Sequence, residues 1–333
     1  MTIYVPQHDE RLMPMTLGYE RLSGETGGSV VRTPAYSWPQ WGITYDFDSE
    51  FIELLDASER AYRAEWDAGT PEQHKIVAEA SMNAGFGDHN AKLRAAAAKY
   101  IREVVNDYSG HVSILDIGAG AGDSALEVYR ALSSRDKKRA KFTLLEPAKL
   151  SLEKAVERMK VECASFECVN VTDNEIGKLK GDYDVIMGVA SVHHHAQIPW
   201  FNYKLALKNG GRLVIADWHN GVWADKGKVY EFLKVLGCSM EGLEHFENTY
   251  KVSGMATPLT QADKDIFTFW KGYVQLLKER GQQGKNAIWP LEGHRPADRY
   301  LDEMDFADFK NLKTAKVLEN TELLGLTVAQ KKD

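Results

Sequence analysis

The most constraining feature of the sequence is an apolar run that leads into a glycine turn and then a helical pattern. Val112 to Ile117 has the length of a buried strand. Three alternate glycines follow, Gly118, Gly120 and Gly122, and a helical pattern begins at Asp123. Glycines allow unusual backbone conformations and let the backbone approach a ligand closely. We therefore expect a strand–turn–helix unit that binds a ligand.

The charge beside this turn discriminates between two classes of ligand. The spacing departs from the G-x-G-x-x-G fingerprint of dinucleotide sites, because the third glycine comes one residue early and Asp123 takes its place. Asp116 precedes the first glycine by two residues, and its carboxylate would repel a diphosphate. S-adenosylmethionine, which carries a sulfonium and an ammonium group, suits such an acid. A plain turn without a ligand is the alternative.

A second acid follows the next predicted strand. The apolar run 141–146 ends in Glu146, and Pro147 follows. This glutamate comes roughly twenty residues after the glycine turn, which is the spacing of acids that bind ribose hydroxyls. NAD-dependent enzymes use an acid in the same way, so Glu146 predicts a nucleoside ligand without choosing the cofactor.

With these residues the chain resembles the class I S-adenosylmethionine-dependent methyltransferases. The resemblance covers residues 90–217 and again about 300–331, and its motif segments are 115–122, 145–147, 166–172, 183–194 and 207–217. Asn170 stands where most members have an aspartate that meets the adenine amino group, and an amide can also bond adenine. The resemblance implies a cofactor site made of Asp116, Gly118, Gly120, Gly122, Glu146, Asn170, Val171, Gly188 and Val189.

The order of strand and helix patterns predicts an α/β fold, a Rossmann-like sheet with helices on both faces. The resemblance adds that the sheet is mostly parallel with an antiparallel last strand, at 323–330. The other expected strands are 112–117, 141–146, 164–169, 183–188 and 212–217, and the expected helices are 92–105, 124–132, 149–160, 174–179 and 199–207. Ligands of such sheets bind beyond the carboxyl ends of the strands.

Two regions fall outside the predicted core of 91–217 and 297–333. Residues 1–90 are rich in aromatics, with a helical pattern at 49–68, and we interpret them as a lid or substrate segment. Residues 218–296 are too long for a simple connection and carry helical patterns at 225–236 and 261–280, so we expect a cap insertion. Lids over the strand ends would align an acceptor and exclude water. Their aromatics favour a small, partly aromatic or apolar acceptor, although they can also form lid cores.

Histidines after the fourth and fifth predicted strands are the candidate catalytic residues. His193, His194 and His195 follow the fourth strand, and His219 follows the fifth. A neutral imidazole there could accept a proton from a hydroxyl or amine acceptor. We single out His194 and His219 for this role, because a histidine at 193 supports the loop in the superfamily.

A metal site is the second interpretation of these histidines. His193 or His195, together with His219, Asp217 and His294, contains enough nitrogen and oxygen ligands for an ion. Nothing in their spacing requires one, so we predict no metal.

Composition fits a globular enzyme, with 44% hydrophobic and 27% charged residues. The net charge of -7 disfavours a nucleic-acid partner, and we interpret the basic run 135–139 as a solvated helix end. No secretory signal or membrane-spanning run is recognisable, and three cysteines form no framework, so we expect a cytoplasmic protein without a membrane partner. The sequence leaves the oligomeric state open.

The resulting prediction is an S-adenosylmethionine-dependent methyltransferase that acts on a small molecule at oxygen, nitrogen or carbon. The alternatives are a nucleotide-dependent oxidoreductase and a non-catalytic protein that binds S-adenosylmethionine. The sequence identifies neither the acceptor nor the methylated atom.

Overall fold

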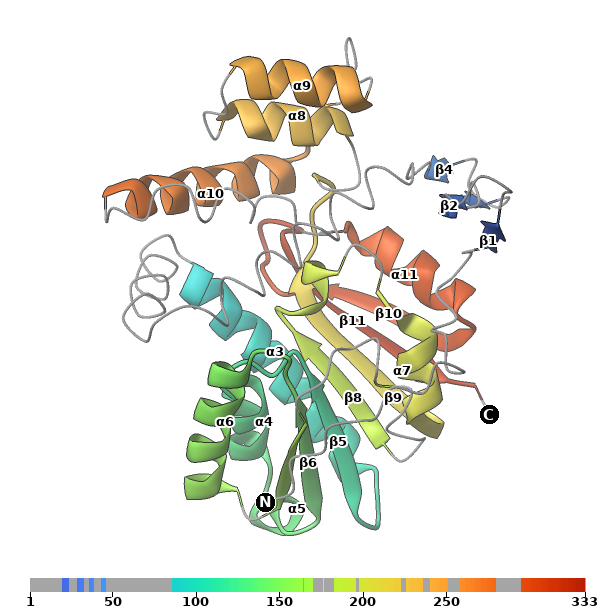
Figure 1. The fold of residues 1–333 in the computed structure, drawn as a ribbon. Coiled ribbons are helices and arrows are strands. Elements are labelled where there is room, and N and C mark those ends of the chain that lie inside the picture. Colours follow the sequence, from blue (N-terminus) through green and yellow to red (C-terminus); the bar gives the residue numbers. More distant parts are fainter. Residues whose placement is uncertain are drawn as a thin grey trace.

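The computed structural model contains one large mixed sheet with helices on both faces and a group of helices beyond its end (Figure 1). The described residues are 20–23, 29–32, 36–38, 43–45, 86–163, 165–169, 176, 183–195, 198–222, 226–235, 240–250, 258–279 and 295–332. The strands of the large sheet are β5 Val112–Ile117, β6 Ala140–Leu145, β7 Phe166–Val169, β8 Tyr183–Val189, β9 Leu207–Trp218, β10 Phe309–Lys316 and β11 Leu324–Lys331.

The seven strands lie in the order β10-β11-β9-β8-β5-β6-β7. Neighbours from β9 to β7 are parallel, and β11 is antiparallel to both β9 and β10. Ile117 pairs with Leu145 on one side and Gly188 on the other, so the carboxyl ends of three strands lie level at one edge. The predicted fold, mostly parallel with an antiparallel last strand, is confirmed.

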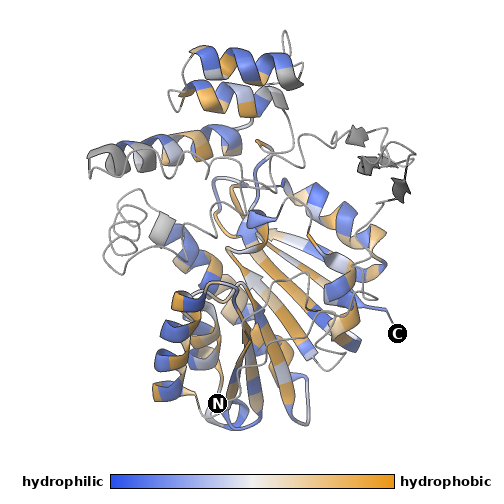
Figure 2. Cartoon of the chain, in the orientation of Figure 1, coloured by the Kyte–Doolittle hydropathy of each residue, from blue (hydrophilic) through white to orange (hydrophobic). Residues whose placement is uncertain are grey.

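Alternate strand residues face two helical layers, which is why the strands read as continuous apolar runs and appear orange in Figure 2. Ile114 packs in the cluster with helices α3, α4 and α6, whereas its neighbour Leu115 packs in the cluster with α7 and α11. The core helices are α3 Phe86–Asn106, α4 Asp123–Ala131, α5 Ser134–Lys137, α6 Lys149–Glu162, the 3-10 turn η2 Val192–His194, α7 Trp200–Ala206 and α11 Ala297–Phe306.

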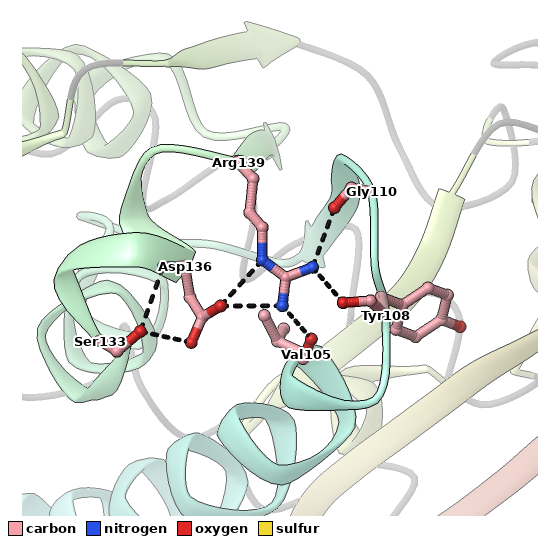
Figure 3. A network of polar contacts seen from close by, with 6 residues as sticks. All are labelled: Val105, Tyr108, Gly110, Ser133, Asp136 and Arg139. Carbon is pink, nitrogen blue, oxygen red and sulfur yellow. Dashed lines mark hydrogen bonds and ion pairs between the residues drawn. The ribbon is translucent and has the colours of Figure 1, made fainter.

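One buried arginine closes the amino-terminal end of the sheet (Figure 3). The guanidinium of Arg139 donates to the carbonyl oxygens of Val105, Tyr108 and Gly110, and it pairs with Asp136 at 2.8 Å. It thereby caps the carbonyl end of α3, where a cation also complements the helix dipole. The prediction that the basic run 135–139 is a solvated helix end is wrong for Arg139. Its side chain is only 11% exposed, and it caps helix α3.

The segment around Gly210 and Gly211 differs from the prediction. The sequence suggested a turn before a strand at 212–217, whereas β9 already begins at Leu207 and runs through both glycines. Gly210 has φ +73°, and a Cβ on Gly211 would lie 2.9 Å from the Lys208 carbonyl oxygen. The glycines therefore form an irregularity inside the strand, beside the register shift of the β8–β9 pairing.

The described residues between β9 and α11 form three helices, where the sequence predicted two: α8 Lys226–Val235, α9 Met240–Tyr250 and α10 Gln261–Glu279. We call them the cap helices. Their buried Phe232, Phe246, Phe267 and Trp270 share one cluster with Trp218 at the end of β9. The cap helices therefore pack on the edge where the parallel strands end, as Figure 1 also shows.

The amino-terminal region is described only at two short antiparallel pairs. These are β1 Glu20–Ser23 with β2 Ser29–Arg32, and β3 Tyr36–Trp38 with β4 Ile43–Tyr45. The predicted helix at 49–68 lies outside the described residues, as does most of the one at 174–179. The predicted domain limits stay a prediction. Among the helices that are described, none has the length and apolarity needed to cross a bilayer.

Candidate active site

The three glycines after β5 serve different purposes. All have positive φ, from +53° to +80°. A Cβ on Gly118 would lie 2.6 Å from the Ser191 side chain, and one on Gly122 would lie 3.2 Å from Ala155. A Cβ on Gly120 would meet no protein atom within 4 Å. Gly118 and Gly122 thus allow close packing, whereas Gly120 borders open space at the strand ends.

Glu146 lies against the same turn. One carboxylate oxygen accepts a 2.8 Å hydrogen bond from the Gly120 amide, and the other accepts one of 2.8 Å from the Ala148 amide. The side chain is buried, and it fixes the middle of the turn. A carboxylate oxygen has a second lone pair, so these bonds leave acceptor capacity for ligand hydroxyls.

Asp116 is the most unusual group of the site. It is 1% exposed, and no hydrogen bond of normal geometry from a described residue reaches either carboxylate oxygen. Burial, and then the nearby Glu146 carboxylate, raise the pKa of Asp116 well above its usual range, while the Ala125 amide opposes the rise. A buried acid without a compensating partner is costly, and a bound cation would remove that cost.

Arg158, which the sequence analysis did not single out, holds the turn from α6. Its guanidinium donates to the Ala121 carbonyl at 2.9 Å and to the Asp123 carboxylate at 2.7 Å. Burial raises the pKa of Asp123, but the bond and charge of Arg158 outweigh it, so the net pKa is lowered. Helical periodicity puts Arg158 on the outer side of a helix and carries no signal of this contact with a loop.

The remaining predicted cofactor residues divide into two groups. Gly188 and Val189 end β8, and a Cβ on Gly188 would lie 3.0 Å from Ile117. Gly188 therefore permits close packing of β8 beside β5. Val189 is buried in the cluster that contains Trp218 and the buried residues of the cap helices. Asn170 and Val171 lie outside the described residues.

The structure joins His193 to Asp217, a pair that the sequence analysis did not predict as a catalytic unit. The His193 Nδ1 lies 2.5 Å from Asp217 Oδ1, and the His193 amide donates to Oδ2 at 3.0 Å. The Trp218 amide also donates to Asp217, at 2.8 Å. Since an ionised carboxylate only accepts, we assign the proton to Nδ1, which leaves the Nε2 lone pair as the basic site. Both residues are buried at the carboxyl ends of β8 and β9.

The other histidines have different surroundings. His194 is half-buried with its ring 4.2 Å from that of His193. His219 is 3% exposed, lies 4.9 Å from the Tyr300 ring and packs over Gly325, where a Cβ would lie 2.0 Å from the imidazole. Burial lowers the pKa of His219 to about 4. This packing offers no geometric support for His219 as the base.

The metal interpretation also finds no set of ligands. Among the residues that the structure describes, no three or more His, Cys, Asp or Glu side chains are arranged to hold an ion. His294 lies outside those residues. Arg295 lies beside His195, and its Nη1 donates a 2.9 Å hydrogen bond to the His195 carbonyl.

Comparison of the sequence with protein-family models and with curated proteins finds no match. Solved structures do match. The citrinin polyketide synthase CMeT domain is 14% identical with a TM-score of 0.52, over 86% of this chain and 67% of that chain. The match to the DszA carbon methyltransferase (12% identity, TM-score 0.48) covers 84% of this chain and 65% of that one. The match to the CurJ carbon methyltransferase (14% identity, TM-score 0.46) covers 72% of this chain and 54% of that one.

This chain therefore spans about half to two thirds of the length of these solved structures. The likeness to the citrinin synthase domain extends over most of this chain. The sheet of this chain is mostly parallel, with its last strand antiparallel. The chain has the fold of the class I S-adenosylmethionine-dependent methyltransferases.

Proposed function

We propose that this protein is an S-adenosylmethionine-dependent methyltransferase that acts on a small, partly aromatic or apolar molecule. The observation that carries the proposal is the buried Asp116 carboxylate, which makes no hydrogen bond of normal geometry with a described residue. It lies near Glu146, the acid that is bonded to the Gly120 amide. A cationic nucleoside supplies what this site lacks. Asp116 would face its positive charge and Glu146 its ribose hydroxyls, whereas a diphosphate would add charge of the wrong sign.

Bound S-adenosylmethionine supplies an electrophilic methyl group, and the protein has to hold and, where needed, deprotonate the acceptor. His193 can accept a proton at Nε2 while its Nδ1–H stays bonded to Asp217. The carboxylate then stabilises the imidazolium, as in other acid–histidine pairs. We infer that His193, rather than His194 or His219, is the base.

The proposed acceptor class rests on the cap helices. His89 of α3 stacks on Trp218 at 5.6 Å, and Phe269 of α10 meets the His89 ring edge-on at 4.5 Å. These rings join the cap helices to the end of β9, within two residues of Asp217. Aromatic residues this close to the proposed base suit a small, partly aromatic or apolar acceptor, and a site that they help to cover would exclude water from the transfer step.

Calorimetry with S-adenosylmethionine tests the proposal. We expect wild-type protein to bind it, and Gly120→Val to lose binding because the side chain fills the open space. Asp116→Asn should bind at least tenfold more weakly, since about 1.4 kcal/mol of charge attraction corresponds to that factor. Gly110→Ala is the matched control, because its added Cβ also meets no atom within 4 Å and Gly110 precedes β5, at the end of that strand opposite the glycine turn.

Wild-type protein that does not bind S-adenosylmethionine would contradict the proposal. Binding without any methyl transfer to a broad panel of phenols, amines and carbon acids would favour the non-catalytic alternative.

A further inference from the structure

We propose that Arg295 is a positioning residue, which ties the end of the cap insertion to the histidine segment 192–195 and so sets the orientation of His193. This role rests on the proposed function, because it concerns the proposed base. Arg295 acts through the backbone of the histidine segment, with a 2.9 Å hydrogen bond to the His195 carbonyl.

The first observation is the pair of bonds that Arg295 makes. Its side chain is 4% exposed. Nη1 donates to the His195 carbonyl at 2.9 Å, and Nε donates to Glu303 at 3.0 Å. The backbone of Arg295 also forms a parallel bridge with His219. One residue therefore contacts the chain after β8, the chain after β9 and helix α11.

The second observation is that Glu303 links Arg295 to the helix that follows the histidine segment. Its carboxylate accepts from Trp200 Nε1 at 2.8 Å and from Arg299 Nε at 2.6 Å. Trp200 begins α7, five residues after the histidine segment ends. Burial raises the pKa of Glu303, but Arg295 and Arg299 outweigh it and keep the pKa lowered, so the carboxylate stays ionised between two guanidinium groups.

These bonds restrain the chain on the carboxyl side of His193. The His195 carbonyl is two residues after His193, and Trp200 is seven residues after it. The Asp217 side of the pair is restrained through His219, two residues after Asp217, which bridges to Arg295 and lies against Tyr300 of α11.

The place of Arg295 in the chain links two ends of the cap insertion. The insertion leaves the core after Trp218, at the end of β9, and its last predicted residue is 296, one beyond Arg295. The bridge between Arg295 and His219 therefore joins the end of the insertion to its beginning.

Nuclear magnetic resonance of protein labelled at the histidine rings tests this role without knowledge of the acceptor. Wild-type His193, assigned by its loss in His193→Gln, should show a single Nδ1-protonated form with widely separated ring-nitrogen shifts. In Arg295→Met these shifts should converge, because Nδ1 and Nε2 exchange the proton once Asp217 is misaligned. The affinity for S-adenosylmethionine should stay within about twofold of wild type.

Arg139→Met is the matched control. Arg139 is equally a buried arginine that donates to backbone carbonyls and pairs with an acid, but it caps α3 at the opposite end of the sheet (Figure 3). It should lower the melting temperature without moving the His193 signals. Unchanged His193 shifts in folded Arg295→Met would overturn the inference. Failure of wild-type protein to bind S-adenosylmethionine would instead refute the proposed function, so the two failures are distinguishable.

Discussion

At the scale of single residues, two buried ionisable groups near the strand ends, an acid and a histidine, are both costly to charge. Asp116 and His219 are both almost inaccessible, and burial disfavours the charged form of each. Asp116 has no hydrogen-bond partner among the described residues, which fits a ligand-binding acid. His219 packs between Tyr300 and Gly325, which fits a structural residue that stays neutral.

His219 should make the protein sensitive to acid. Its pKa is about 4 in the folded protein against 6.5 for the ordinary side chain, so the unfolded chain binds a proton first. Stability from this residue is complete above pH 6.5 and is lost as the pH falls toward 4, by about 3 kcal/mol in total. Urea unfolding at a series of pH values should therefore show a shallower decline in His219→Phe than in wild type.

The exposed His111 provides the comparison for that experiment. His111→Gln should leave the acid profile as it is in wild type, because the residue is exposed. Identical profiles for wild type and His219→Phe would show that the imidazole is not buried neutral.

At the scale of elements, a buried ion pair attaches the cap helices to the core. Asp263, in the first turn of α10, is fully buried and pairs with Lys228 of α8 at 2.7 Å. Its other oxygen accepts from the Gly221 amide at 3.1 Å, three residues after β9 ends. One carboxylate thus joins two cap helices and the chain that leaves the sheet.

Loss of this carboxylate should release the cap helices before the core unfolds. Asp263→Ala leaves Lys228 with a buried charge, which costs about 3–5 kcal/mol when no partner replaces the acid. We expect faster hydrogen exchange in α8 and α10, and unchanged exchange in β5 and β8. Asp265 lies on the same helix and accepts a 2.8 Å hydrogen bond from Gln261, so Asp265→Ala should show the exchange of wild type in both regions. Uniform loss of protection across core and cap in Asp263→Ala would contradict a local role.

At the scale of the whole molecule, the ligand should stabilise the fold in a way that separates the two cofactor classes. A ligand that binds only the folded state at 100 times its Kd stabilises by about 2.7 kcal/mol. S-adenosylhomocysteine should therefore raise the melting temperature by a few degrees, whereas NADH should leave it unchanged. A rise with NADH alone would favour the oxidoreductase alternative.

Local patterns were sufficient for most of the core. The strands β5, β6 and β8 begin and end within one residue of their predicted bounds, because each is a short, mostly apolar run, followed by Gly118 after β5 and by Glu146 after β6. The long β9 was not predicted, since its first residues include two glycines whose place depends on pairing with β8. The helix α9 was not predicted either. Its Phe246 is buried in a cluster with residues of α8 and α10, a contact between segments that no local pattern records.

The sequence by itself determined the order of the elements and the glycine turn with its two acids, because these follow from apolar periodicity and from residues adjacent in the chain. Tertiary structure decided how the polar residues pair. His193 meets Asp217, Arg158 meets the glycine turn, and Arg295 meets the histidine segment, across separations of 24, 37 and 100 residues. Such contacts depend on which strands lie side by side and on which groups burial forces to find partners, and no local pattern records either.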